Sequence, residues 1–386
     1  MLYYIIFFIF GIYNLYADLT INAKSYVAYD SNFNMILLQK DKDIKISPAS
    51  ITKLMVLYLA FKAIEEKKIN LDTLVNVSYN AYKKGHYSKG VSTIFLKQGD
   101  SISVKDLITG IIVSSGNDAS IALSEFIGGT EEHFVSLMNN QAKNLGMYNT
   151  NFANVDGIDN PNHYSTAYDI FLLSYHLLKD YPQYYSFFSI KEFQFNGINQ
   201  KNRNYLLDKK ILDSIQIDGL KTGHTDLSKY SLAFSAVDEN NFRIIGALIG
   251  AKSDKDRFKE TQKIISYIYT NYHQLKLFAN NQIIIKIPIL KGSNYYYKIK
   301  ADKDINVILP KKYDKKDLIV SIIYNEYMIA PIKYQDKIAT IKIKTKDEKY
   351  NFLIDIYATK DTPQSNKVWL LIKAPFVAIK KFINKY

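Results

Sequence analysis

The sequence contains no cysteine in its 386 residues. This absence excludes disulfide bonds and every metal site that needs a thiolate. The six histidines are scattered, and none belongs to a His-Glu-x-x-His motif, which argues against a zinc centre. There is also no nucleic-acid recognition motif, so the net charge of +13 indicates a lysine-rich surface or an anionic membrane or polymer partner. We therefore expect no metal, no cofactor and no nucleic-acid partner.

The N-terminal end predicts an exported protein. Residues 2–13 form an uncharged apolar run that is too short for an ordinary membrane-spanning helix. Ala17 offers a small residue for cleavage before Asp18. We expect residues 1–17 to be a signal peptide, with a buried strand or helix as the alternative.

The C-terminal end predicts a membrane anchor. Residues 361–366 are typical of a polar linker, and residues 367–386 contain five lysines and no acidic residue. On a helical wheel most of these lysines fall in one sector, opposite Leu371, Phe376, Ile379 and Phe382. Such an amphipathic helix lies in the interface of an anionic membrane. A terminal helix docked on the protein is the alternative.

The region between the two ends predicts two domains. Residues 18–278 mix a hairpin over 25–40 with helices over 54–66, 119–127, 131–146, 164–178 and 257–272, and strands over 230–237 and 242–249. From about residue 280 the helical patterns give way to short alternating strands separated by turns. We expect an α/β (α+β) domain followed by a small all-β, sandwich-like domain over residues 279–360, and then the amphipathic helix.

A serine and a lysine three residues apart mark a helix start. Ser47 is a favoured N-cap residue and Pro48 suits the first helical position. On a helix, Ser50 and Lys53 would share a face, so the lysine could take the proton of the serine hydroxyl if its pKa were lowered. Backbone N–H groups of the first turn could hold a developing oxyanion. Taken alone, Ser-x-x-Lys is common and predicts little.

Two further short motifs follow in the chain. Ser115-Gly116-Asn117 supplies a hydroxyl and an amide in a loop between two helical patterns. Lys221-Thr222-Gly223 supplies a cation and a hydroxyl on an edge strand, where the glycine leaves room for a ligand. Each motif is weak alone. The ordered set of three is typical of the serine enzymes that bind β-lactams.

With their flanks, the motifs resemble the D-alanyl-D-alanine carboxypeptidases, which are low-molecular-mass penicillin-binding proteins. The segments that carry this resemblance are Pro48-Ala49-Ser50-Ile51-Thr52-Lys53-Leu54-Met55, Ser115-Gly116-Asn117-Asp118-Ala119 and Asp218-Gly219-Leu220-Lys221-Thr222-Gly223-His224-Thr225-Asp226. The resemblance covers nearly the whole chain. It implies a catalytic domain like that of serine β-lactamases and transpeptidases, and a peripherally anchored enzyme on the periplasmic face of the bacterial cytoplasmic membrane.

Two segments depart from the family pattern. The chain reads Asp156-Gly157-Ile158-Asp159 where such enzymes commonly have His-Gly-Leu-Asp. It reads Ser228-Lys229 where an Ala-Gly pair is usual. Neither departure touches the three motifs, so we expect altered rate or β-lactam sensitivity rather than loss of activity.

The resemblance also implies roles for the motif residues. Ser50 would attack the penultimate D-Ala carbonyl of a peptidoglycan stem peptide, with Lys53 as the base, and a β-lactam would acylate the same serine. Ser115 would relay a proton and Asn117 would orient Lys53. The substrate-binding set would be Lys221, Thr222, Gly223, His224 (through its backbone N–H, with that of Ser50) and Arg257.

Three other functions remain open. A β-lactamase is disfavoured because the additional all-β domain and the C-terminal anchor fit such an enzyme poorly. A D,D-endopeptidase would use the same residues on a cross-linked substrate. A non-catalytic cell-wall-binding protein would show no covalent penicillin label.

Overall fold

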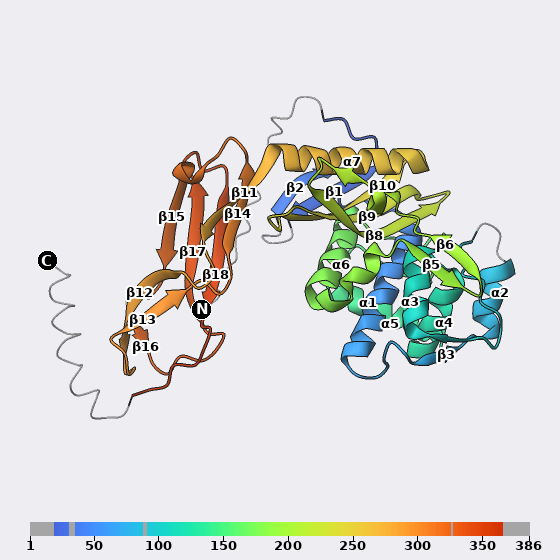
Figure 1. Cartoon of the computed structure of the whole chain (residues 1–386), viewed down its shortest axis with the longest axis horizontal. Helices are drawn as coiled ribbons and strands as arrows, with labels where there is room; N and C mark the ends of the chain where they lie inside the picture. The colour runs from blue at the N-terminus through green and yellow to red at the C-terminus, as the bar shows by residue number, and fades with distance from the viewer. Residues whose placement is uncertain (1–18, 31–34, 88–90, 326, 366–386) are drawn as a thin grey trace. The chain divides into compact units, whose positions relative to one another are not determined.

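The computed structural model describes residues 19–30, 35–87, 91–325 and 327–365, and the chain forms two compact units (Figure 1). The first unit is Met1–Thr270 and the second is Asn271–Tyr386. The boundary lies before the expected one at 278/279, because β11 (Tyr272–Phe278) pairs with β14 (Ile305–Pro310) of the second unit. The expected signal peptide and the amphipathic C-terminal helix lie outside the described residues.

A six-stranded antiparallel sheet runs through the first unit. Its strand order is β2-β1-β10-β9-β8-β7. The expected hairpin is present, since β1 and β2 pair with Tyr26 opposite Lys40. Helices lie on both faces in Figure 1, with α7 on one side and α1 and α6 on the other, so β8 to β10 are almost wholly buried. The strands are β1 (Ser25–Asp30), β2 (Met35–Lys40), β7 (Lys210–Ile211), β8 (Ile215–Thr225), β9 (Lys229–Val237) and β10 (Arg243–Ala251).

The helices of the first unit other than α7 pack their apolar faces into one core with the sheet. Hydroxyl side chains cap three of them, because Ser103, Thr130 and Thr166 each accept a hydrogen bond from the backbone N–H three residues on. The helices are α1 (Lys53–Glu65), α2 (Tyr79–Tyr87), α3 (Val104–Val113), α4 (Asn117–Gly128), α5 (Glu131–Asn144), α6 (Ala167–Asp180) and α7 (Asp254–Asn271). Two small two-stranded sheets complete the unit, β3 (Leu74–Asn76) with β4 (Ser101–Ser103) and β5 (Glu192–Phe195) with β6 (Ile198–Lys201).

The second unit is all-β with its own apolar core, as the sequence predicts. Its three sheets have the orders β11-β14, β13-β12-β16 and β15-β17-β18. The expected linker is not loose over the residues that are described, because Thr362 bridges Ile332 and Gln364 bridges Gly292. The remaining strands are β12 (Ile283–Leu290), β13 (Tyr296–Lys300), β15 (Leu318–Ile323), β16 (Met328–Ile329), β17 (Lys337–Thr345) and β18 (Asn351–Tyr357).

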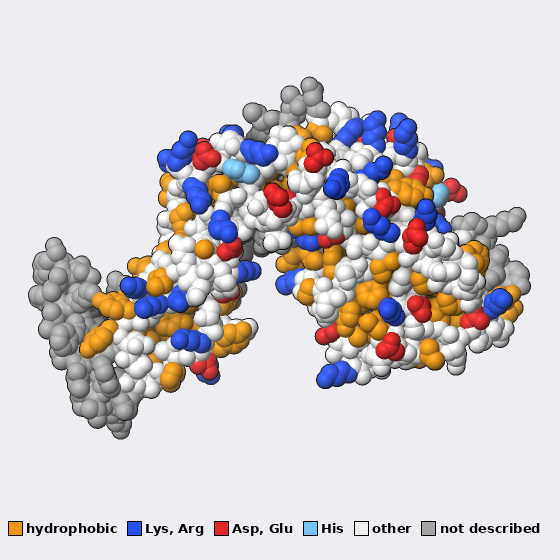
Figure 2. Space-filling view, viewed as in Figure 1, with side chains coloured by type: hydrophobic (Ala, Val, Ile, Leu, Met, Phe, Trp, Pro, Cys, Tyr) orange, Lys and Arg blue, Asp and Glu red, His pale blue; other side chains and the backbone are white. Residues whose placement is uncertain are grey.

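Charge is dispersed over the face of the molecule that Figure 2 shows. On the face shown in Figure 2, Lys and Arg side chains are spread over both units and interleaved with acidic ones. This distribution matches a lysine-rich solvated surface better than one concentrated basic patch.

Candidate active site

Ser50 lies in a tight turn that leads into α1. The turn, Ala49–Thr52, is a 3-10 helix, and Lys53 is the first residue of α1. The prediction that Ser47 caps this helix is wrong, because Pro48 occupies the N-cap position and the Ser47 Oγ donates to Asp159 at 2.7 Å. Ala49 has a φ of 49°, an unfavourable value for a non-glycine residue. The turn is therefore held in shape by its neighbours, as is common where a reactive side chain must be presented.

The Lys53 ammonium joins the first two motifs. Its side chain is fully buried, and its Nζ donates to Ser50 Oγ at 3.0 Å and to Asn117 Oδ1 at 2.9 Å. A third bond, of 2.6 Å, goes to the main-chain oxygen of Asp156. These three acceptors match the three protons of an ammonium group. The lysine is thus aimed at the serine hydroxyl from a fixed position.

The environment of Lys53 makes it a usable base. Burial and, to a smaller extent, the positive charge of Arg203 lower its pKa, the carboxylates of Asp156 and Asp118 oppose this shift, and the resulting pKa is about 8. With that pKa, about one molecule in ten holds a neutral lysine at pH 7. A neutral Lys53 can accept the Ser50 proton.

Ser115 and Asn117 stand at the start of α4. Ser115 has a φ of 62°, and its buried Oγ has no hydrogen-bond partner among the described residues. Asn117 is the first residue of α4 and also approaches Asp156, with its Nδ2 3.4 Å from Oδ2. A buried hydroxyl without a partner is costly unless a ligand supplies one. The Ser115 hydroxyl is therefore available to a substrate group.

The third motif borders the nucleophile turn. Gly223 lies so close to the turn that a Cβ there would be 3.0 Å from the Pro48 carbonyl oxygen. At Lys221, Thr222 and Gly223, β8 pairs with β9, while β7 reaches only the start of β8. One edge of β8 is thus left unpaired beside Ser50, where an extended peptide could add as a strand.

Lys221 adds a second buried amine to the site. Its side chain is 1% exposed, and its Nζ donates to the Thr222 carbonyl oxygen at 3.2 Å. Burial, together with the positive charges of Lys53, Arg203 and Arg257, lowers its pKa well below the usual range. A bound anionic group would offset the repulsion between these positive charges, so the site favours a ligand with a carboxylate.

Arg257 stabilises β8 at the third motif. Its Nη1 donates to the Gly223 carbonyl oxygen at 3.1 Å, and its guanidinium forms an ion pair with Asp254. It also lies 4.6 Å over the ring of Phe258. These contacts place Arg257 beside the substrate-binding motif, and its binding of a carboxylate stays a prediction. His224 is exposed and stacks on Tyr230 with ring centroids 4.1 Å apart.

Comparison with known families agrees with this geometry. A family model described as D-alanyl-D-alanine carboxypeptidase matches residues 14–253, and a model of the C-terminal domain of penicillin-binding protein 5 matches residues 272–364. This chain belongs to the D-alanyl-D-alanine carboxypeptidase family.

Relatives of the carboxypeptidase family match in sequence and in structure. The chain is 35% identical over 326 residues to the D-alanyl-D-alanine carboxypeptidase DacA of Escherichia coli, covering 84% of this chain and 80% of that protein. It is 36% identical over 291 residues to DacA of Haemophilus influenzae, covering 75% and 73%. The crystal structure of penicillin binding protein 5 from Haemophilus influenzae superposes with a TM-score of 0.80 at 31% identity, covering 90% of this chain and 100% of that one.

Sequence reasoning missed a loop that this carboxypeptidase packs against the nucleophile turn. Gly157 has a φ of 85°, and a Cβ there would lie 2.0 Å from the Ala49 carbonyl oxygen. Asp159 accepts hydrogen bonds from Ser47 and Thr225, both at 2.7 Å. The loop therefore ties the nucleophile turn to the end of β8. The signal in the sequence is the segment Asp156-Gly157-Ile158-Asp159, which local patterns identify only as a departure from the family motif.

His163 is a second missed support. Its Nδ1 accepts from the Ala153 backbone N–H at 2.9 Å, and its Nε2 lies 2.7 Å from Thr52 Oγ1. Because Nδ1 accepts, we assign the proton to Nε2, which donates to Thr52. Burial lowers the pKa of His163 to about 4, so the ring is neutral at physiological pH. It fixes the nucleophile turn without adding charge near Lys53.

Potential metal ligands do not cluster in the part of the chain that the structure describes. Among them, no group of three or more His, Asp or Glu side chains could hold a metal ion. The positions of Ser50, Lys53 and Asn117 suit acyl transfer to a serine with an amine as the base.

Proposed function

We propose that this chain is a serine-type D-Ala-D-Ala carboxypeptidase that removes the terminal D-Ala from peptidoglycan stem peptides. The observation that carries this proposal is the fully buried Lys53 Nζ, 3.0 Å from Ser50 Oγ and 2.9 Å from Asn117 Oδ1. Membership of the family supplies the substrate class. The roles of the individual residues below are part of the proposal.

Acylation begins with neutral Lys53. The amine takes the Ser50 proton as the oxygen attacks the carbonyl carbon of the penultimate D-Ala. Backbone N–H groups of Ser50 and His224 hold the oxyanion of the tetrahedral intermediate. The C–N bond then breaks as Ser115 passes its proton to the leaving amine and regains one from the Lys53 ammonium, so that D-Ala departs and Lys53 is neutral again.

The substrate is held by its terminal carboxylate and by its backbone. Lys221 and Thr222 lie on the unpaired edge of β8, where the peptide can add as a strand and bring its carboxylate to the cation. Arg257 fixes the Gly223 carbonyl of that strand. Arg203 is solvent-accessible in the same positive field and offers a further contact for a carboxylate.

Deacylation regenerates the free Ser50 hydroxyl. Water attacks the ester carbonyl, its proton passes to Lys53, and the ester C–O bond breaks as Ser50 regains a proton. A β-lactam acylates Ser50 by the same first step, but its ring-opened leaving group stays attached. The acyl-enzyme then persists because no product has departed to make room for water.

We also propose that the enzyme is exported and works at the periplasmic face of the cytoplasmic membrane. The apolar run over 2–13 supports export, and the amphipathic pattern of 367–386 supports peripheral anchoring. Across the described residues, no helix has the length and apolar character needed to cross a bilayer. Deleting 367–386 should move the protein from the membrane fraction to the soluble one.

The activity is tested by the products. The wild-type protein should release one equivalent of D-Ala from a pentapeptide ending in D-Ala-D-Ala, and Ser50→Ala should release none. Cleavage of cross-linked muropeptide dimers, with no free D-Ala, would instead assign a D,D-endopeptidase. Rapid steady-state hydrolysis of a chromogenic cephalosporin would assign a β-lactamase, and no reaction with any of these would leave a non-catalytic wall-binding protein.

A further inference from the structure

One carboxylate joins the two segments that carry the backbone donors of the oxyanion. Asp159 Oδ1 accepts a hydrogen bond from the Ser47 hydroxyl at 2.7 Å, and Ser47 precedes Ser50 by three residues. The same oxygen accepts the Thr225 hydroxyl at 2.7 Å, and Thr225 directly follows His224. The proposed function places the oxyanion between the backbone N–H groups of Ser50 and His224. The connection Ser47–Asp159–Thr225, here called the Asp159 link, therefore joins the two halves of that site.

No direct hydrogen bond duplicates the Asp159 link. Between the described residues 47–53 and 221–228, none of the hydrogen bonds passes straight from one segment to the other. The two segments meet by close packing, since a Cβ at Gly223 would lie 3.0 Å from the Pro48 carbonyl oxygen. Close packing sets how near the segments can come, whereas a directional hydrogen bond also limits how far they can separate.

The turn between β8 and β9 also depends on Asp159. Lys229, the first residue of β9, has a φ of 54°, which is unfavourable for a residue with a side chain. Thr225 Oγ1 accepts the Ser228 backbone N–H at 3.0 Å, and Asp159 Oδ2 lies 3.4 Å from the Leu227 backbone nitrogen. Asp159 thus contacts the turn as well as the end of β8, so it holds both against the nucleophile turn.

We propose that Asp159 is a positioning residue that sets the distance between the Ser50 and His224 backbone N–H groups, an inference that rests on the proposed function. Asp159 acts through Ser47 and Thr225 rather than on the substrate. A hydrogen bond weakens steeply as its geometry departs from the ideal, so a displaced donor stabilises the oxyanion less. Loss of the Asp159 link should therefore slow the chemical step and leave noncovalent binding of the substrate nearly unchanged.

The kinetic test is acylation by a fluorescent penicillin, with the limiting rate constant and the half-saturation concentration measured separately. Ser47→Ala and Thr225→Val each remove one end of the link, and Asp159→Ala removes its centre. Each should lower the limiting rate constant about tenfold and keep the half-saturation concentration within about twofold. Asp159→Asn should recover most of the rate, because its amide oxygen can accept both hydroxyls.

A double variant tests whether the two ends act as one connection. Once either end is lost, the link no longer holds the two segments together. Ser47→Ala combined with Thr225→Val should therefore lower the limiting rate constant no more than either change alone. Two residues that act separately would instead give losses that multiply.

Hydrogen exchange tests the link without the reaction. The backbone amides of residues 47–52 should exchange several-fold faster in Thr225→Val than in the wild type, although the substituted residue lies on β8. A purely local role of Thr225 would change exchange only in β8 and in the turn that follows it.

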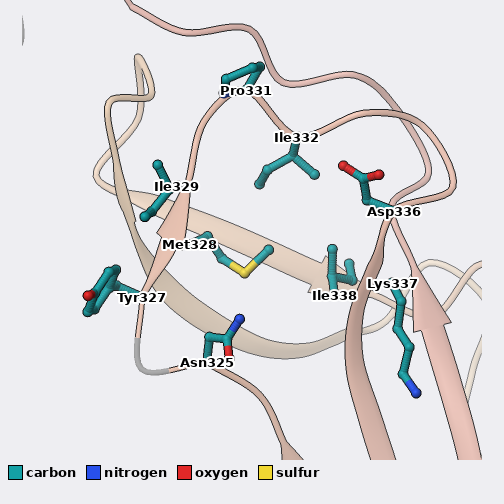
Figure 3. Close-up of a pocket in the computed structure, with 9 residues that line it drawn as sticks. All are labelled: Asn325, Tyr327, Met328, Ile329, Pro331, Ile332, Asp336, Lys337 and Ile338. Carbon is teal, nitrogen blue, oxygen red and sulfur yellow. The ribbon is translucent and has the colours of Figure 1, made fainter. Parts of the chain in front are cut away.

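Two aspartates outside the link provide matched controls. Asp238 follows β9 directly, at the opposite end of that strand from Lys229, and its half-buried carboxylate likewise accepts two hydrogen bonds on Oδ1, at 2.9 and 2.8 Å. Asp336 belongs to the second unit, where Figure 3 shows it beside Ile332 in the lining of a hollow. Asp238→Ala and Asp336→Ala should both leave the acylation rate and the exchange of residues 47–52 unchanged.

Three results would overturn the proposal. Multiplied losses in the double variant would show that Ser47 and Thr225 act separately. A change confined to the half-saturation concentration would assign Asp159 to substrate binding. Unchanged exchange of residues 47–52 in Thr225→Val would show that the link does not hold the nucleophile turn. A wild type that penicillin does not acylate would overturn the proposed function and the oxyanion role with it, and the exchange result separates that failure from a failure of the link.

Discussion

The sharpest prediction concerns Asp156. Its carboxylate raises the pKa of Lys53, whereas burial lowers that pKa and so makes the lysine a base. Its charge favours the protonated lysine, while its main-chain oxygen holds the Nζ at 2.6 Å. Asp156→Asn removes the charge and keeps the side-chain size, one acceptor oxygen and the main-chain contact. The pKa of Lys53 should therefore fall below its value of about 8.

The size of the effect follows from the neutral fraction of Lys53. Loss of one adjacent opposite charge lowers an amine pKa by about one unit, which raises the neutral fraction at pH 7 from about one tenth to about one half. Acylation at pH 7 should then be about fivefold faster, with less than a twofold change above about pH 9. The measurement is the second-order rate constant for acylation by a fluorescent penicillin against pH, which reports the free enzyme.

A control separates this effect from a general change of charge. Asp226→Asn removes an exposed carboxylate next to the end of β8 that has no described contact with Lys53, and its pH profile should match the wild type. If the acid limb of Asp156→Asn stays in place or moves to higher pH, then Asp156 does not tune Lys53, and the account of the base is wrong.

Two further predictions concern the nucleophile turn and the orphaned hydroxyl. Gly157→Ala should reduce the rate of acylation at least tenfold, because its Cβ would lie 2.0 Å from the Ala49 carbonyl oxygen. The control is Gly197→Ala, at a position with a similar φ of 77° where the added Cβ would meet no atom within 4 Å. This control should keep the rate of acylation within about twofold of the wild type. Equal loss in both variants would show that backbone strain, and not the contact, is responsible. Ser115→Ala should leave the melting temperature nearly unchanged, because the buried Oγ has no partner to lose, yet it should slow D-Ala release at least tenfold. A large fall in melting temperature would instead make Ser115 a structural residue.

The sequence predicted the parts of the site that local motifs encode. Ser50 and Lys53 sit on one turn, so their spacing alone places them within reach of each other. Asn117 and the Lys221 strand could be assigned to the same site only through the order of the motifs and the family resemblance. The structure brings them together through hydrogen bonds and close packing between segments far apart in the chain.

The supports around the motifs depend on contacts that no local pattern encodes. Ser47 has the residue type of a helix cap, but its hydroxyl instead donates a hydrogen bond to Asp159, more than a hundred residues away in the chain. Gly157 and His163 lie in a turn-rich loop whose contacts with the nucleophile turn appear only when the chain is folded.

Non-local contacts also explain the two differences between the expected fold and the observed one. The sequence predicts alternating strands only from about residue 280, so it indicates a domain boundary at 278/279 and misses β11. Its pairing with β14, a non-local contact, assigns it to the second unit instead. Residues 361–365 have the composition of a linker but are held by backbone bridges, which any composition can form.

The central claim is that Ser50 is the acylated nucleophile and Lys53 its base. The most direct measurement is the intact mass of the protein after incubation with penicillin, followed by peptide mapping, for wild type, Ser50→Ala and Lys53→Met. We expect wild type to gain the mass of one penicillin on the peptide that contains Ser50, Ser50→Ala to gain none, and Lys53→Met to acylate at least a hundredfold more slowly. An adduct on another residue, or one that forms equally fast in Lys53→Met, would contradict the account.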